Sequence, residues 1–269
     1  MNTSPGSTGD ASLVTIEHDA YRVAGVVRVT MNRPDAFNAL SEALLDGLQQ
    51  TLTGIAKTDA RVVVIAGAGR AFCAGHDLKE MRAAPSLAYY QQLFARCTKL
   101  MLTIQRMPQP VIACVHGIAT AAGCQLVAMC DLAVAADTAR FAVSGVNLGL
   151  FCATPSVPLS RNLSRKAALE MLLTGDFIDA AEARKQGLVN RVAPADALDD
   201  EVARLAASIC AKPVEAVSAG KGLFYRQLEM GIEAAYQLAG QTMACNMMAD
   251  SALEGVQAFI DKRAPEWKR

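Results

Sequence analysis

The sequence predicts an α/β fold whose last third is helical. Short apolar runs typical of buried strands alternate with helical patterns up to about residue 196, whereas strand and turn signals thin out after it. A chain of 269 residues can form one large domain or two small ones. We therefore expect β-β-α units over residues 11–196, a helical region over 197–269, and a disordered Ser-, Thr- and Gly-rich tail over 1–10.

The first half of the α/β part predicts two strands, a helix, a third strand and a second helix. Residues 13–17 and 25–31 have strand character, and a helix follows with Ser41 as its N-cap and leucines on one face. The uninterrupted apolar run 62–66 is typical of a strand buried on both faces. Residues 87–106 place their apolar side chains at helical spacing, so a long helix is expected there.

The second half repeats this pattern before the chain becomes helical. A strand over 110–115, a small-residue loop over 116–122 and a helix over 123–129 come first. The remaining expected elements are strands 131–136 and 140–143, helix 166–173, a helix from the capping residue Asp179 to 186, strand 188–192, and helices 197–210, 213–229, 232–248 and 251–261.

Charge and cysteine usage exclude several classes of function. Lys plus Arg and Asp plus Glu both number 26, so no overall field favours nucleic acid or an anionic membrane. The eight cysteines lack C-x-x-C pairs and metal-type spacing, and most lie in apolar runs, which predicts reduced core thiols and no metal site. With no basic residue before Arg22 and no apolar signal core, we expect a cytoplasmic protein.

Two loops have the composition of a backbone binding site. Residues 67–80 follow the apolar strand 62–66 with small residues that leave backbone N–H groups uncovered. The segments 74–77 and 121–125 each lead into a helix. If the sheet brings them together, two amides could hold one carbonyl oxygen as an oxyanion hole. Taken alone, each small-residue loop is more often a tight packing turn.

Three segments closely resemble the enoyl-CoA hydratase/isomerase, or crotonase, superfamily. They are residues 31–40, 67–78 and 116–126, followed by Cys130-Asp131, and the similarity extends from about residue 13 to 267. The resemblance implies a spiral of β-β-α turns, a helical trimerisation region, and assembly into a homotrimer or a dimer of trimers. It also implies an acyl-CoA thioester as substrate, with CoA arriving as part of that substrate and no other cofactor.

The same resemblance assigns site residues. The amides matching His76 and Ala122 would grip the thioester carbonyl. The residues expected to line the substrate path are Phe37, Ala39, Ala74, His76, Asp77, Leu78, Lys79, Ala121 and Ala122.

The two catalytic positions of the family's hydratases are altered in this chain. Those hydratases use two glutamates, and the matching positions hold Gln125 and Gly145. An amide does not titrate near neutral pH and glycine has no side chain, so neither can act as general acid or base. Gln125 could still orient water or an acyl group by hydrogen bonding.

Other polar residues near the motifs have two readings each. The His76 side chain is either a polar wall of the pocket or an acid or base, and Asp77 either caps a helix or acts as a base. Cys152 has no basic neighbour in sequence, which favours pocket lining over a catalytic thiolate, and Asp131 is expected to be a structural turn carboxylate.

Three functions remain open at this stage. The chain could be a crotonase-type enzyme that stabilises an enolate with altered proton-transfer groups. It could bind acyl-CoA without catalysis, since both carboxylates are replaced. It could also be an oligomeric interaction protein with a vestigial site, because the helical tail is apolar enough for subunit packing.

Overall fold

The computed structural model describes residues 12–83 and 85–267, and its strands form two sheets. The larger has the order β1-β2-β3-β5-β7-β10 and the smaller β4-β6-β8-β9; only the β1–β2 and β8–β9 pairs are antiparallel. The tail expected over residues 1–10 lies outside the described residues. The strands are β1 Val14–His18, β2 Val26–Met31, β3 Val62–Gly67, β4 Ala71–Cys73, β5 Val111–Val115, β6 Ile118–Thr120, β7 Leu132–Ala136, β8 Arg140–Ala142, β9 Ile178–Asp179 and β10 Arg191–Ala193.

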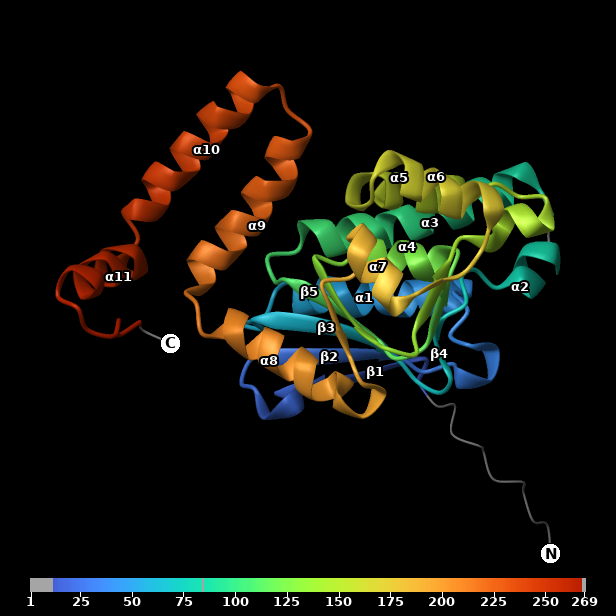
Figure 1. The fold of residues 1–269 in the computed structure, drawn as a ribbon, viewed down its shortest axis with the longest axis horizontal. Helices are drawn as coiled ribbons and strands as arrows, with labels where there is room; N and C mark the ends of the chain where they lie inside the picture. The colour runs from blue at the N-terminus through green and yellow to red at the C-terminus, as the bar shows by residue number, and fades with distance from the viewer. Residues whose placement is uncertain (1–11, 84, 268–269) are drawn as a thin grey trace, which may run out of the picture.

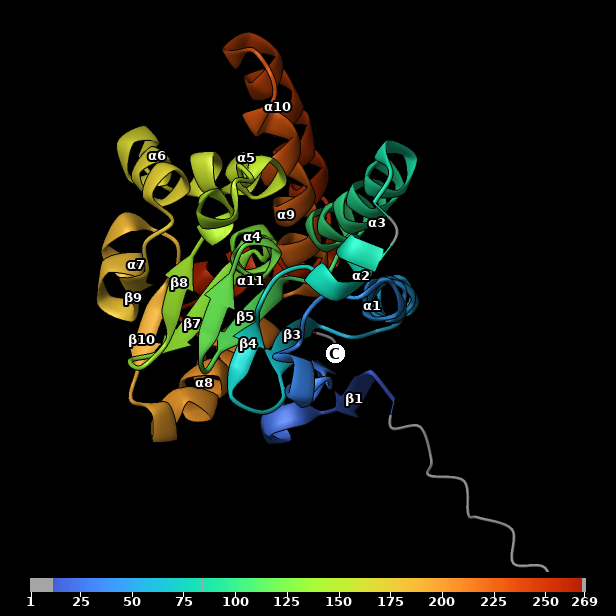
Figure 2. The same cartoon turned by 90° about the vertical axis from the view of Figure 1, so that its right-hand side faces the viewer.

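Helices cover both faces of the larger sheet (Figures 1 and 2). Helix α8 packs on one face, while the other carries the smaller sheet with α1, α3 and α4. The helices are α1 Glu42–Ile55, α2 Leu78–Ala83, α3 Leu87–Arg106, α4 Ala122–Met129, α5 Ala153–Asn162, α6 Arg165–Thr174, α7 Ala180–Gln186, α8 Leu198–Cys210, α9 Val214–Leu228, α10 Ile232–Met247 and α11 Asp250–Ile260.

The central strand β3 shows why its sequence is apolar throughout. Val63 and Ile65 face the core that includes α1, α3 and α4, whereas Val62 and Val64 face the core under α8. A parallel strand with helices on both sides has no solvent face, so the polar alternation of an exposed strand is absent. The eight cysteines are free, and six of them are buried, as the apolar runs predicted.

Helices α9, α10 and α11, called the C-terminal arm below, project away from the sheets at the left of Figure 1. Within the arm α9 has no fully buried residue, and α10 and α11 bury only Ala235 and Ala258. Helix α8 precedes the arm but packs on the sheet, so within the helical region expected over 197–269 the packing changes after α8. Among the described helices, none combines the length and apolar character that crossing a bilayer requires.

Several elements differ from the sequence prediction. Both loops of the expected site contain a short strand, β4 and β6, and these two pair with each other in the smaller sheet. Helix α5 was not predicted, because Pro155 and Pro158 discourage a helical interpretation although Pro155 lies in the first turn. The strand expected over 188–192 is wrong in its bounds, because it covers Arg191–Ala193. Asn190, just before it, donates its amide to the Ala133 carbonyl and accepts from the Ala133 amide with its side chain.

Candidate functional site

The segment from Ala74 to Asp77 is held on one side by Leu40. The Leu40 N–H donates to the Gly75 carbonyl at 2.7 Å, and the Asp77 N–H donates to the Leu40 carbonyl at 3.3 Å. These two bonds form a parallel bridge between Leu40 and His76. In such a bridge the central residue's own N–H points away from the partner strand, so the His76 amide faces away from Leu40.

The second loop packs against the other side of the same segment. Gly75 has φ of +94°, and a Cβ there would lie 2.9 Å from the Ala121 Cβ and 3.3 Å from the Ala122 nitrogen. The Thr120 hydroxyl also donates to the Ala74 carbonyl at 3.0 Å. The two loops thus approach so closely that only glycine fits between them.

Two backbone amides remain without acceptors at this junction. Ala122 is the first residue of α4, where N–H groups have no intrahelical partner, and Ala121 before it has φ of 49° and ψ of −119°. Among residues 12–83 and 85–267, neither the Ala122 amide nor the His76 amide donates a hydrogen bond. The sheet therefore brings together the two amides that the sequence singled out.

The His76 side chain is a half-buried wall of this region. Its ring meets Phe94 of α3 edge-on, with centroids 5.6 Å apart. Neither ring nitrogen has a hydrogen-bond partner in the described part of the chain, and burial lowers the pKa of the imidazole. The ring is therefore neutral at pH 7, and no carboxylate orients it as a general base.

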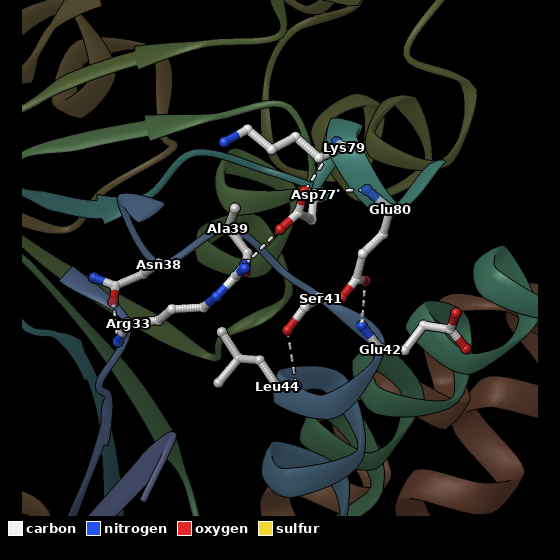
Figure 3. Close-up of polar contacts among 9 residues, drawn as sticks. All are labelled: Arg33, Asn38, Ala39, Ser41, Glu42, Leu44, Asp77, Lys79 and Glu80. Atoms are coloured by element: carbon white, nitrogen blue, oxygen red, sulfur yellow. Dashed lines mark hydrogen bonds and ion pairs between the residues drawn. The ribbon is translucent and has the colours of Figure 1, made fainter. Parts of the chain in front are cut away.

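Asp77 caps α2 and forms an ion pair. One carboxylate oxygen accepts from the amides of Lys79 and Glu80 at 2.9 and 3.3 Å, and the other accepts from Arg33 at 2.7 Å (Figure 3). Burial by itself would raise the pKa of Asp77, but these hydrogen bonds hold it below its ordinary value. The carboxylate is thus ionised and fully engaged, as the capping interpretation predicted.

The two altered glutamate positions have different surroundings. Gln125 lies one turn into α4, is 4% exposed, and its Oε1 has no partner among the described residues. Gly145 lies in the 3-10 turn Ser144–Leu148, where a Cβ would come within 2.5 Å of the Leu150 carbonyl oxygen and 2.7 Å of the Cys152 sulfur. Position 145 therefore has no room for a side chain. The neighbouring Cys152 is buried, and burial raises the pKa of its thiol, which fits pocket lining better than a reactive thiolate.

The remaining expected path residues lie around the same junction. Phe37, Leu78 and Lys79 are exposed, whereas Ala39, Ala74 and Ala121 are partly buried. The Phe37 carbonyl accepts from the Ala74 amide at 3.0 Å, which joins the first motif to the second. The guanidinium of Arg70 lies over the Phe37 ring, 5.2 Å from its centroid.

Sequence reasoning missed Arg33, Asn38, Phe94 and Leu150. Asn38 has φ of 54°, and its side chain accepts from the Arg33 amide and donates to the carbonyls of Ala68 and Ala71. Residues 31–40 were recognised as a family motif that gave Arg33 and Asn38 no role, yet these two residues connect two loops. Phe94 and Leu150 carry no local signal, because their roles depend on contacts with distant segments.

Comparisons with known proteins identify the family of this chain. The family model "Enoyl-CoA hydratase/isomerase" matches residues 22–269. The crystal structure of an enoyl-CoA hydratase from Mycobacterium smegmatis is similar with a TM-score of 0.93 and 63% identity, over 95% of this chain and 99% of that one. Human enoyl-CoA hydratase domain-containing protein 3 has a TM-score of 0.90 and 42% identity, over 95% of this chain and 100% of that one. The rat protein of the same name is 44% identical over 244 residues, 90% of this chain and 81% of its own length.

These relatives contradict one prediction from the sequence. The proteins of that name from rat, mouse, Xenopus laevis, human and Danio rerio are all called mitochondrial, so the expected cytoplasmic location is wrong. That expectation depended on free thiols and on the lack of basic residues before Arg22. Free thiols report a reducing environment and not a particular compartment.

In sequence and in fold, over nearly the whole of its length, this chain belongs to the enoyl-CoA hydratase/isomerase family.

Proposed function

We propose that this protein binds acyl-CoA thioesters and holds the thioester carbonyl oxygen with the backbone amides of His76 and Ala122. The observation that carries the proposal is the junction at Gly75, where two loops bring two acceptor-free amides together. The Ala122 amide also lies at the N-terminus of α4, whose dipole favours negative charge. Such a pair suits the oxygen of a thioester and, still better, that of the enolate formed from it.

The chemistry that this site supports is enolate stabilisation without the usual acid and base. Preorganised donors contribute on the order of 10²- to 10³-fold each to rate where negative charge develops. Missing proton-transfer groups cost on the order of 10²- to 10⁴-fold each. Gln125 hydrogen-bonds to the acyl group or to water, and the neutral His76 ring forms part of the wall.

A second function, acyl-CoA binding without turnover, is favoured by the surroundings of Gly145. The space that a catalytic side chain would occupy holds the Leu150 carbonyl and the Cys152 sulfur. The catalytic side chain is thus absent, and in addition its space is occupied by other atoms of the chain. A protein that retains the carbonyl grip but not the proton-transfer groups is suited to act as a sensor or carrier of acyl-CoA.

The remainder of the substrate and the assembly follow from the surface. The exposed Phe37, Leu78 and Lys79 would line the pantetheine and adenine path, with Arg70 beside Phe37 as a further cation. The exposed apolar side chains of the C-terminal arm would be covered in a homotrimer or a dimer of trimers. CoA is part of the substrate, and the proposal involves no metal.

Binding and turnover should be measured separately. Isothermal titration calorimetry with butyryl-CoA should show binding, and a panel of enoyl-, hydroxyacyl- and malonyl-type CoA thioesters tests turnover. Binding with turnover of any panel member supports the enzyme, whereas binding without turnover supports the carrier or sensor. Absence of binding would refute both functions.

Gly75→Ala tests the carbonyl grip directly. The added methyl group meets Ala121 and Ala122 and separates the two loops, so the affinity for butyryl-CoA should fall about 2- to 10-fold. Gly187→Ala is the matched control, because Gly187 has nearly the same φ of +93° but its Cβ would meet only the Asn162 carbonyl at 3.1 Å. Equal affinities of the two variants would count against the proposed grip.

A further inference from the structure

We infer that Arg33 and Asp77 form a clasp that aims the His76 amide at the thioester oxygen, which makes both of them positioning residues. The inference rests on the proposed function and adds the residues that set the direction of one of its two donors. The Arg33–Asp77 clasp is defined as the Arg33 guanidinium, the Asp77 carboxylate and the Ala39 carbonyl (Figure 3).

The clasp joins the two segments that form the Leu40–His76 bridge. The same guanidinium nitrogen of Arg33 donates to the Asp77 carboxylate at 2.7 Å and to the Ala39 carbonyl at 3.1 Å. Ala39 directly precedes Leu40, and Asp77 directly follows His76. Arg33 therefore connects the residue before one bridge partner to the residue after the other.

The Leu40–His76 bridge by itself holds the His76 amide only weakly in its direction. It consists of two backbone hydrogen bonds, one of them 3.3 Å long, and the Ala74 amide adds a third bond between the two segments, to the Phe37 carbonyl at 3.0 Å. A charge-assisted hydrogen bond to a carboxylate that is 9% exposed is stronger than any of these bonds. The direction of the His76 N–H, which the bridge sets, thus depends on a side-chain pair outside the bridge.

Asp77 also couples this direction to the start of α2. Its second oxygen accepts from the amides of Lys79 and Glu80, so these two bonds restrict rotation of the carboxylate when Arg33 moves. Arg33 is in turn positioned at its own backbone, because its amide donates to the Asn38 side chain at 2.9 Å. Both ends of the pair are therefore anchored before any ligand arrives, which is the requirement for a preorganised donor.

The test compares a ligand that has a carbonyl with one that lacks it. Butyryl-CoA and its thioether analogue S-butyl-CoA differ only in the atom that the His76 and Ala122 amides would hold. Their affinity ratio, measured by calorimetry, reports the carbonyl grip, whereas a general structural defect weakens both ligands equally. In Asp77→Asn we expect the ratio to fall about 2- to 10-fold, because the affinity for butyryl-CoA should fall by that factor more than the affinity for S-butyl-CoA.

Two further variants make the result decisive. Arg33→Gln lacks the positive charge and is two bonds too short to reach both Ala39 and Asp77, so it should lower the ratio in the same way, and it serves if Asp77→Asn does not fold. Arg96→Gln is the control: Arg96 pairs with Glu42 at the same 2.7 Å on a more exposed surface, and its loss should leave the ratio at the wild-type value.

Each outcome separates the clasp from the proposed function. A wild-type protein that prefers the thioester, with variants that retain this preference, refutes the clasp and leaves the function intact. Variants that lose affinity for both ligands equally also refute the clasp, because they indicate a structural role. A wild-type protein that binds neither ligand, or binds both equally, refutes the proposed function and the clasp with it.

Discussion

At the scale of single residues, position 145 has surroundings that leave no space for the side chain that the family's hydratases have there. The glycine allows the Leu150 carbonyl and the Cys152 sulfur to approach to distances that a Cβ would not tolerate. The Leu150 amide also returns a hydrogen bond of 2.9 Å to the Gly145 carbonyl, which fixes this close approach. Restoring a glutamate there requires movement of backbone and not just of a flexible side chain.

Restoring both glutamates should therefore fail to create a hydratase. In Gln125→Glu with Gly145→Glu we expect no gain in crotonyl-CoA hydration over Gln125→Glu alone, and a stability loss of about 1–3 kcal/mol from overpacking. Hydration assays and urea denaturation of both variants measure the two effects. A large gain in hydration by the double variant would show that the loop at Leu150 moves aside.

His76 predicts a pH dependence of stability. Burial lowers its pKa from the ordinary 6.5, so below that pH the unfolded chain binds a proton that the folded chain resists. The free energy of unfolding should therefore fall as the pH drops through 6.5 towards the lower folded pKa, and His76→Gln should show a shallower decline. Denaturant titrations over this pH range test it, with the exposed His18→Gln as control. Equal slopes for wild type and His76→Gln would contradict the expectation.

The sequence predicted these residues where their roles are local. Ser41 caps α1 and Asp77 caps α2, because an N-cap depends on residues two or three positions ahead. The Arg33–Asp77 pair joins residues 44 positions apart, so no local pattern could reveal it. The crowding at Gly145 likewise depends on how residues 150–152 turn back on it.

At the scale of elements, Asp131 anchors the C-terminal arm to the body. Its carboxylate accepts from Lys221 and Tyr225 of α9 at 2.7 Å each, and from the Val111 amide at 2.6 Å. Lys221 also donates to the carbonyls of Ile104 and Gln109, both at 2.8 Å. Burial lowers the pKa of Lys221 even though Asp131 opposes the shift. The structural role expected for Asp131 is thus confirmed, and it extends to a helix 90 residues away.

Removal of this carboxylate should loosen the arm. Asp131→Asn leaves the buried Lys221 charge without its partner, which should lower the free energy of unfolding by about 3–5 kcal/mol. Hydrogen exchange should show α9 losing protection before the sheet does. Arg161→Gln is the control, since it breaks an exposed pair with Glu229 at the end of α9 and should cost about 1 kcal/mol or less. Equal losses in the two variants would argue against the anchor.

Element prediction succeeded where periodicity and caps agree. Helix α3 has the predicted bounds because Ser86 caps it and its apolar residues keep helical spacing to Ile104. The three-residue strands β4 and β6 are too short for a periodic signal, and they exist because the smaller sheet pairs them. The two loops of the site were thus recognised correctly, but the sheet that joins them was not visible in the sequence.

At the scale of the whole molecule, the C-terminal arm exposes several large apolar side chains. Phe259 is 85% exposed, Met248 75%, Tyr236 74% and Ile232 71%. The helices of the arm project away from the two sheets (Figure 1). Large exposed apolar side chains on one part of a molecule are typical of a subunit interface, which is the basis of the proposed assembly.

Negative charges introduced on the C-terminal arm should lower the number of chains in the assembly. We expect size-exclusion chromatography with light scattering to give the mass of three or six chains for the wild type, and a lower mass for Met248→Glu with Phe259→Glu. Leu87→Glu is the control, because Leu87 is 75% exposed but begins α3 instead of lying on the arm. A monomeric wild type would contradict the assembly.

Gly75 and Gly123 lie beside the site, and the lack of a side chain at both positions allows neighbouring segments to pack in direct contact. A Cβ on Gly123 would lie 2.1 Å from the Cys73 carbonyl oxygen, so α4 rests directly on β4, just as Gly75 rests on Ala121. The spacing of the His76 and Ala122 amides therefore depends on two close contacts, Gly75 with residues 120–122 and Gly123 with Cys73, whereas the direction of the His76 amide is the part that we assign to the Arg33–Asp77 clasp. A substitution at either glycine should therefore change the spacing of the two amides, whereas a substitution that leaves both contacts in place should not.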